Sequence, residues 1–257
     1  MIMVFGGTTE GKKVAGFLDR ADNAYIYSTK NRSEPPMMRN GEYRWGALDE
    51  FAMQKLFVDR KVSVVVDAAH PFAIELHKSA ERVSRSLGIP VIRFERDYAI
   101  PSDILSGVKH CYADSFESAI MIMKNLAPRR VLAATGVQTI DVLRSYWEQR
   151  EMKMRILPSS RSSATAIRKG FPPGDLIMMS PPSTWEQERH CLLAYGIDCL
   201  LTKENGASGF LPEKIKAAKS LSIPLVIVRR PRLDGSFIVV DTIDELAKTL
   251  AFCAEES

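Results

Sequence analysis

The sequence has few of the residues that build disulfide frameworks and metal centres. Its 257 residues include four Cys and four His, and the cysteines lie far apart without a CxxC pair. This pattern excludes a disulfide-stapled secreted domain and a zinc ribbon. We expect no resident metal, and we expect small buried thiols, as in a reducing cytosol, at Cys111, Cys191, Cys199 and Cys253.

Long apolar runs and a strong charge of one sign are also missing. No stretch approaches the roughly 20 apolar residues of a membrane span. The opening MIMVFGG lacks the basic region and the cleavage site of a signal peptide. The net charge is +4, and the Lys and Arg residues are dispersed rather than clustered as in nucleic-acid-binding proteins. We therefore expect a cytoplasmic protein without membrane or nucleic-acid partners, whose mild positive excess suits an anionic small molecule.

The composition is that of a globular protein, with 46% hydrophobic and 26% charged residues, and the length fits one large or two small domains. Short apolar runs alternate with amphipathic stretches. The Val-rich residues 62–68 are typical of a buried strand, and residues 10–20 place Val14, Phe17 and Leu18 on one helical face. This alternation predicts an α/β fold in which parallel sheets are flanked by helices.

An internal echo predicts two halves of similar architecture. SLGIPVI at 86–92 is similar to SLSIPLV at 220–226, and each joins an expected helix to an expected strand. Both expected strands end in arginines, namely Arg93 and Arg96 in the first half and Arg229 and Arg230 in the second. We expect the first domain to span 1–99 and the second to span 100–257, with the strand at 237–240 and the helix at 244–254 closing the second.

Ligands of open parallel sheets bind beyond the carboxyl ends of the strands. A glycine-rich run follows the first expected strand, where a dinucleotide fingerprint belongs, although Thr8 replaces the second glycine of GxGxxG. The backbone can approach a phosphate here and the hydroxyls can donate to it. The alternative is a tight turn with a helix cap. The candidate cofactor residues of this run are Gly6, Gly7, Thr8, Thr9, Glu10 and Gly11.

The end of the second expected strand carries Ser28, Thr29, Lys30, Asn31 and Arg32. NAD-binding domains usually place an acidic residue there to bind the ribose 2′-hydroxyl. The two cations instead favour a 2′-phosphate and hence NADPH, and a solvated loop is the alternative. In the second half, Thr135 and Gly136 form a further small-residue turn that we assign to the cofactor.

Two more loops carry groups suited to chemistry. His70, Pro71 and Phe72 follow the strand at 62–68, where an imidazole can bind a ligand or pass a proton, or can instead serve the structure. In the second half the corresponding loop has Lys203, Glu204, Asn205 and Gly206, with a paired surface loop as the alternative. The remaining histidines, His77, His110 and His190, lack metal-ligand spacing and are predicted to be structural.

The ordered set of motifs resembles the precorrin-6A reductase family of cobalamin biosynthesis, including its cobalt-precorrin-6A branch. The matching runs are GGTTEG at 6–11, VVDAAHPFA at 65–73, RFER at 93–96, ATG at 134–136, LTKENG at 201–206 and IPLVIVRRP at 223–231. They span nearly the whole chain.

The resemblance implies two Rossmann-like domains with the active site in a cleft between them. It implies the NADPH-dependent reduction of one carbon–carbon double bond, which converts precorrin-6A to precorrin-6B without flavin or metal. In this chain His70 is the first candidate for proton delivery, Glu204 the second and solvent the third. Candidate contacts for the carboxylates of the tetrapyrrole are Arg93, Lys203, Arg229 and Arg230, and the other expected substrate contacts are Pro71, Phe72, Asn205 and Gly206.

Two other functions fit the residues. One is an NADP-dependent oxidoreductase for a different anionic substrate, and the other is a non-catalytic two-lobed protein that binds an anion. The sequence leaves open whether the substrate carries cobalt and whether the protein is a monomer or a homodimer.

Overall fold

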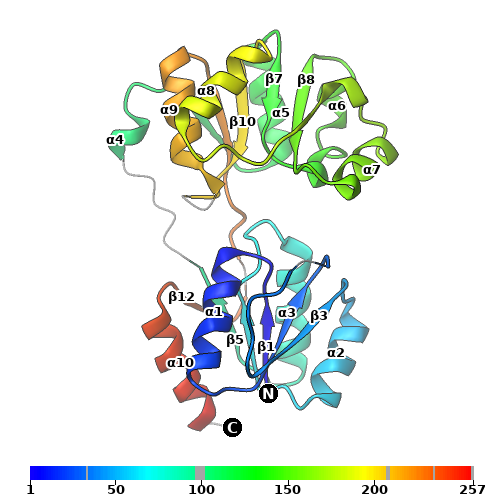
Figure 1. The fold of residues 1–257 in the computed structure, drawn as a ribbon, viewed down its shortest axis with the longest axis vertical. Helices are drawn as coiled ribbons and strands as arrows, with labels where there is room; N and C mark the ends of the chain where they lie inside the picture. Colours follow the sequence, from blue (N-terminus) through cyan, green and yellow to red (C-terminus); the bar gives the residue numbers. More distant parts are fainter. Residues whose placement is uncertain (33, 96–101, 207–208, 234, 256–257) are drawn as a thin grey trace. The chain divides into compact units, whose positions relative to one another are not determined.

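A computed structural model describes residues 1–32, 34–95, 102–206, 209–233 and 235–255. The chain divides into two compact units, one formed by Met1–Asp97 with Arg232–Ser257 and the other by Tyr98–Pro231 (Figure 1). Each unit contains a six-stranded parallel sheet flanked by helices, which confirms the predicted α/β class.

The sheet of the first unit has the order β12-β5-β4-β1-β2-β3. Its strands are short and mostly buried, as expected for parallel strands that are covered on both faces. They are β1 (Ile2–Phe5), β2 (Tyr25–Thr29), β3 (Gly41–Trp45), β4 (Val64–Asp67), β5 (Val91–Phe94) and β12 (Phe237–Val240). The helices of this unit are α1 (Thr9–Arg20), α2 (Glu50–Asp59), α3 (Ile74–Ser86) and α10 (Ile243–Glu255).

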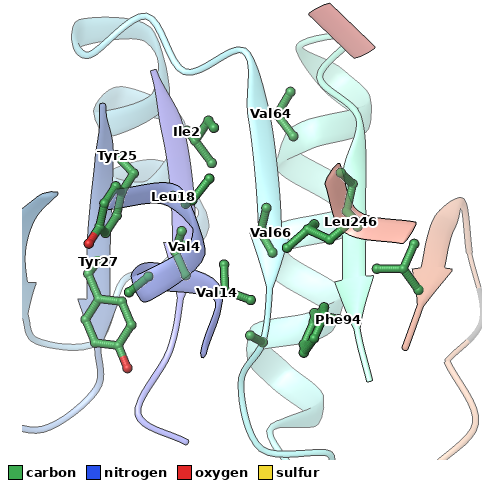
Figure 2. Packing of buried hydrophobic residues seen from close by; sticks show 14 of the residues in the cluster. Ile2, Val4, Val14, Leu18, Tyr25, Tyr27, Val64, Val66, Phe94 and Leu246 are labelled. Carbon is green, nitrogen blue, oxygen red and sulfur yellow. The ribbon is translucent and has the colours of Figure 1, made fainter. Parts of the chain in front are cut away.

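Alternate residues of β1 pack into two hydrophobic clusters, one on each face of the sheet. Val4 of β1 packs in a cluster with Val14 and Leu18 of α1 and with Val66 of β4 (Figure 2). Met3, the neighbour of Val4, belongs to the cluster on the opposite face of the sheet. Because successive side chains of a strand point to opposite faces, a strand with helices on both sides must be apolar throughout. This explains the continuous valines of β4.

The sheet of the second unit has the order β6-β11-β10-β7-β8-β9. Its strands are β6 (His110–Ala113), β7 (Val131–Ala133), β8 (Met152–Ile156), β9 (Leu176–Met178), β10 (Cys199–Lys203) and β11 (Leu225–Val228). Its α-helices are α4 (Ser102–Leu105), α5 (Phe116–Leu126), α6 (Arg144–Trp147), α7 (Ser160–Arg168), α8 (Trp185–Ala194) and α9 (Leu211–Leu221). The two orders correspond position by position, and the two copies of the echo lead into β5 and β11, which occupy equivalent places.

The outermost strand at one end of each sheet pairs with a strand that is distant in sequence. β12 pairs with β5, with Phe237 opposite Val91, although β12 follows the whole second unit in sequence. β6 follows β5 in sequence but pairs with β11 in the second unit. Residues 232–257 therefore belong to the first unit, which corrects the expected 100–257 domain. Apolar periodicity marks a segment as a strand, whereas the unpaired backbone of a sheet edge decides which sheet it joins.

The described residues contain no helix that is both long and apolar enough to cross a membrane. Nor do they contain a group of three or more His, Cys, Asp or Glu side chains placed to hold a metal ion. The described residues contain no disulfide, and the cysteines other than Cys111 are buried.

Candidate functional site

The glycine turn after β1 is built around its own side chains. The Thr8 hydroxyl accepts the Gly11 N–H at 2.9 Å, which caps α1, and donates to the Ala68 carbonyl at 2.6 Å. A hydroxyl has one proton to donate. The proton of Thr8 goes to Ala68, which corrects the expectation that this hydroxyl donates to a phosphate. Thr8 therefore acts as the cap of helix α1, which is the alternative considered for this run.

Tyr27 of β2 fills the space beside this turn. Its hydroxyl accepts the Gly7 N–H at 3.0 Å, and Gly6 donates to the Ser28 carbonyl at 2.9 Å. Burial raises the pKa of Tyr27, and the bond from Gly7 only partly offsets this effect. Gly11 is needed for a different reason, because a Cβ there would lie 2.7 Å from the Gly6 Cα. Packing inside the unit therefore demands Gly6 and Gly11.

We expect Gly6→Ala to lower the free energy of unfolding by about 1–3 kcal/mol, the usual cost of overpacking. The added Cβ would lie 2.3 Å from a ring carbon of the buried Tyr27. Gly16→Ala in the same unit is the matched control, since its Cβ meets only Arg20 at 3.6 Å, and alanine inside a helix is more stable than glycine by about 0.5–1 kcal/mol. Urea unfolding of both variants tests this. Equal stability of the Gly6→Ala variant and the parent would contradict the packing argument.

The rest of the predicted phosphate turn lies at the start of α1. Gly7 is exposed and has φ +88°, which glycine adopts without strain. Thr9 is exposed, whereas Glu10 is buried in the first turn, where its charge complements the helix dipole. Thr9 and Glu10 stay predictions as cofactor contacts.

The ends of β2 and β3 bring cations and aromatic rings together. Ser28 and Thr29 are buried, whereas Lys30 and Arg32 are exposed. Arg44 of β3 lies opposite Ser28 in the sheet and donates to its hydroxyl at 2.6 Å. A second bond from Arg44 reaches the Gly46 carbonyl at 3.0 Å. Burial lowers the pKa of Arg44, which remains a cation at neutral pH.

Sequence reasoning missed Arg44. Residue 44 lies beside residue 28 only because β2 and β3 pair in parallel with this register. The sequence offers the strand at 41–45 but does not give the register.

A cavity of about 510 Å³ opens next to this group and is lined by Arg32, Glu34, Pro35, Tyr43 and Trp45. The Arg32 guanidinium lies 5.8 Å from the centre of the Trp45 ring, which is 54% exposed. The cavity thus combines an accessible aromatic surface with a cation at the strand end where a nucleotide fold binds its ribose.

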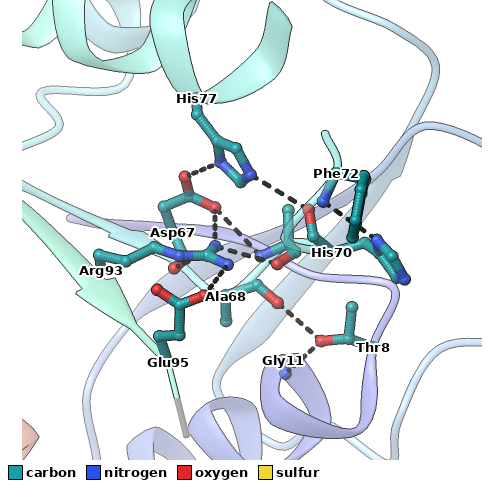
Figure 3. A network of polar contacts seen from close by, with 10 residues as sticks. Thr8, Gly11, Asp67, Ala68, His70, Phe72, His77, Arg93 and Glu95 are labelled. Carbon is teal, nitrogen blue, oxygen red and sulfur yellow. Dashed lines mark hydrogen bonds and ion pairs between the residues drawn. The ribbon is translucent and has the colours of Figure 1, made fainter. Parts of the chain in front are cut away.

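The loop after β4 rests on a buried ion network (Figure 3). Asp67 is bound by His77 at 2.5 Å, by Arg93 at 3.0 Å and by the Ala69 N–H at 3.0 Å. Burial alone would raise the pKa of Asp67, but the bond from His77 and the charge of Arg93 outweigh it and hold the pKa below its ordinary value. Asp67 is therefore a buried carboxylate that organises the loop.

Arg93 does not have the predicted role. Its side chain is 1% exposed, and it also donates to the backbone carbonyls of Asp67 and Ala69 and lies 3.7 Å from Glu95. A guanidinium that is buried and paired in this way is not an exposed contact for a substrate carboxylate, which corrects that expectation. Arg96, the second arginine of the run, lies outside the described residues.

His70 projects from this loop and is exposed, whereas Pro71 is buried and Phe72 is half-buried. The His70 Nδ1 accepts the Phe72 N–H at 3.2 Å, and the two rings lie 5.9 Å apart. Because Nδ1 acts as an acceptor, the neutral imidazole carries its proton on Nε2.

In the second unit, the turn after β7 is closed by its own hydroxyls. Thr139 donates to the Gly136 carbonyl at 2.8 Å, so the 2.6 Å bond between Thr135 and Thr139 uses the Thr135 proton. Gly136 has φ +83°. The Thr135 hydroxyl therefore binds within the turn, and a cofactor role for Thr135 and Gly136 stays a prediction.

The ends of β10 and β11 gather the other predicted residues. Glu204 accepts the Arg230 N–H at 3.1 Å, and Arg229 pairs with Asp114 at 2.6 Å. Burial lowers the pKa of Lys203 to about 8, and the ammonium lies 5.7 Å from the centre of the Phe116 ring. Asn205 and Gly206 continue this loop. The structure thus places Lys203, Glu204, Arg229 and Arg230 at the carboxyl ends of two neighbouring parallel strands, where positive charge exceeds negative charge.

A buried cluster in the same unit was not predicted. Arg155 of β8 pairs with Glu188 of α8 at 2.8 Å, and both side chains are buried. Lys214 of α9 donates to the Gly209 carbonyl, and burial, with the charge of Arg155, lowers the pKa of Lys214 to about 8. Lys214 therefore holds the backbone at Gly209, just before α9.

Comparison with known proteins assigns the family. The model of precorrin-6x reductase CbiJ/CobK matches residues 1–253. A cobalt-precorrin-6A reductase of Methanothermobacter thermautotrophicus is 30% identical over 97% of this chain and 84% of its own length. One of Methanocaldococcus jannaschii is 28% identical over 79% of this chain and 78% of its own.

A solved structure supports the same fold. The CobK precorrin-6A reductase superposes with a TM-score of 0.76 at 24% identity, covering 98% of this chain and 96% of that one. The match of the family model to nearly the whole chain, together with the twin parallel sheets, shows that this protein belongs to the precorrin-6x reductase family.

Proposed function

We propose that this reductase uses NADPH to reduce one carbon–carbon double bond of precorrin-6A or cobalt-precorrin-6A, giving the corresponding precorrin-6B in cobalamin biosynthesis in the cytoplasm. The observation that carries the proposal is the family match over residues 1–253. The relatives from Methanothermobacter thermautotrophicus and Methanocaldococcus jannaschii, both cobalt-precorrin-6A reductases, supply the substrate class.

The first unit fits the phosphorylated nucleotide. Arg32 and Arg44 lie where an NAD-specific domain would place an acidic residue, and Ser28 holds Arg44 in position. Trp45 and Tyr43 offer aromatic surface in the adjoining cavity, and Glu34 on its wall can accept from a ribose hydroxyl. First-turn N–H groups of a helix lack intrahelical acceptors, so the start of α1 is the phosphate contact of this proposal. When bound, NADPH supplies the hydride.

The protein's own residues orient the substrate and deliver the proton. His70 is the first candidate to deliver a proton, from Nε2, to the carbon next to the one that receives the hydride, with solvent returning a proton to Nε2. Glu204, which accepts the Arg230 N–H, is the second candidate for proton delivery, and solvent is the third. Lys203, Arg229 and Arg230 provide the positive edge for the acetate and propionate groups of the tetrapyrrole.

The direct test is anaerobic incubation with precorrin-6A, or with its cobalt form, and NADPH. We expect the loss of NADPH absorbance to match the change in ring absorbance one to one. Tight binding of the tetrapyrrole without NADPH oxidation would instead identify a binding protein, and oxidation with neither precursor would overturn the assignment of substrate. Comparing the two precursors shows which form is preferred.

Lys203 predicts a pH dependence of substrate binding. Burial lowers the pKa of Lys203 to about 8, so its ammonium is mostly charged at pH 7 and is lost as the pH rises through 8. We expect KM for the tetrapyrrole to rise severalfold between pH 7 and pH 9. Lys203→Arg, which stays charged, should flatten this profile. The same rise in the Lys203→Arg variant would contradict the role of Lys203, and Lys219→Arg on α9 is the matched control.

A further inference from the structure

The loop after β4 is held in an unusual way, because side chains bind four consecutive backbone carbonyls (Figure 3). The bonds run from Arg93 to Asp67 at 3.1 Å, from Thr8 to Ala68 at 2.6 Å, from Arg93 to Ala69 at 2.9 Å and from His77 to His70 at 3.1 Å. The donors come from α1, β5 and α3 or their ends. The path of the chain up to His70 is therefore fixed by side chains outside the loop.

His77 is bound at both ring nitrogens. Its Nε2 faces the His70 carbonyl, which can only accept, so Nε2 carries a proton. Its Nδ1 lies 2.5 Å from Asp67 Oδ2. The other oxygen of Asp67 accepts from Ala69 and Arg93, and both bonds favour the ionised carboxylate. The shared proton thus belongs to Nδ1, and His77 is an imidazolium whose side chain is 1% exposed.

His77 lies in the first turn of α3, where a positive charge is unfavourable. α3 begins at Ile74 after Ala73, which offers no side-chain cap. A cation near a helix N-terminus opposes the helix dipole. Asp67 of β4 compensates this buried charge. Asp67 also pairs with Arg93, which in turn lies 3.7 Å from Glu95, so the four residues form one network. A neutral side chain would avoid this cost, so the network calls for a function beyond packing.

We propose that His77 is a positioning residue of the reductase site, an imidazolium that ties the Asp67 carboxylate to the His70 carbonyl and thereby fixes the loop that presents His70 and Phe72. The inference rests on the proposed function, because the role of this loop in the reaction belongs to that proposal. The backbone Ala73 N–H also binds the His70 carbonyl, at 2.8 Å, so His77 supplies the second of its two bonds.

The first test reads the charge directly in the unmodified protein. Nitrogen-15 NMR of histidine side chains at pH 7 should show His77 with both ring nitrogens protonated. The protein has four histidines, so the His77 signals are assigned as those that persist in His70→Ala, His110→Gln and His190→Gln. A neutral His77 with one bare nitrogen overturns the proposal. This result does not depend on whether the variant at position 77 folds.

The second test is a double-mutant cycle. We expect His77→Gln to lower kcat about 10- to 100-fold, the scale of a small misplacement of a reacting group, while KM for NADPH stays within about twofold. In a His70→Ala background the same change should lower kcat by less than about threefold, because the group that it positions is gone. Equal factors in both backgrounds overturn the proposal, as does full activity of His77→Gln.

His190→Gln is the matched control, since this exposed residue lies on α8 of the other unit, and it should retain the parent activity. Failure of the proposed function has a different signature. The parent would then oxidise no NADPH with either precursor, whereas the NMR spectrum would still report the state of His77.

Discussion

Asp67→Asn should lower the free energy of unfolding by about 3–5 kcal/mol, the range for removing one partner of a buried ion pair. The carboxylate is completely buried and binds Arg93 and His77. Neutralising it leaves buried positive charge without its partner. Urea unfolding at pH 7 measures the loss, and a variant as stable as the parent would show that the network contributes no net stability.

The pH dependence of the same carboxylate has a definite sign. The pKa of Asp67 is lower in the folded protein than in the unfolded chain, since the bonds from His77 and Arg93 outweigh burial. Its stabilisation is complete above the ordinary carboxyl range and is lost as the pH falls below about 4 toward the folded pKa. The parent should therefore lose stability more steeply with acid than Asp67→Asn does.

Asp141→Asn is the control for this comparison. Asp141 is also bound by two cations, Lys169 and Arg144, which lower its pKa, but its side chain is exposed. Solvent screens such a pair, so we expect only a small change in stability. A large loss at Asp141 and none at Asp67 would reverse the argument.

Removing the cations at the ends of β2 and β3 should change cofactor selectivity. We expect Arg44→Met to weaken NADPH binding about 10- to 100-fold relative to NADH, because a charge-assisted bond to phosphate contributes about 1.5–3 kcal/mol. The Arg32→Ala, Arg44→Met double variant should exceed 100-fold on the same reasoning. Dissociation constants for the two nucleotides, measured by calorimetry, give the ratio.

Arg39→Met provides the matched control, since this exposed arginine precedes β3 and pairs with Asp22 at the opposite end of the strand. It should leave the ratio unchanged. Lys30→Ala tests the second cation predicted from sequence, which is exposed and should contribute less than Arg44. An unchanged ratio in the Arg44 variants would remove this residue from the nucleotide site.

The sequence by itself determined most of the elements and the loops in which we propose chemistry. Period and composition located β4 and α1, and the echo at 86–92 and 220–226 marked strands that proved equivalent in the two sheets. The loops at 70–72 and 203–206 fall at strand ends, as predicted. These features follow from local pattern, because a strand buried on both faces must be apolar and a parallel sheet opens its sites where strands end.

Only the tertiary structure decided which partner each side chain meets. Arg93 looks like Arg229 in sequence, yet Arg93 lies beside Asp67 in the interior while Arg229 pairs with Asp114 at the surface. Arg44 reaches the proposed nucleotide site through a strand register, and β12 joins the first sheet across more than half of the chain. Burial and long-range pairing set these outcomes, and neither is encoded in the spacing of neighbouring residues.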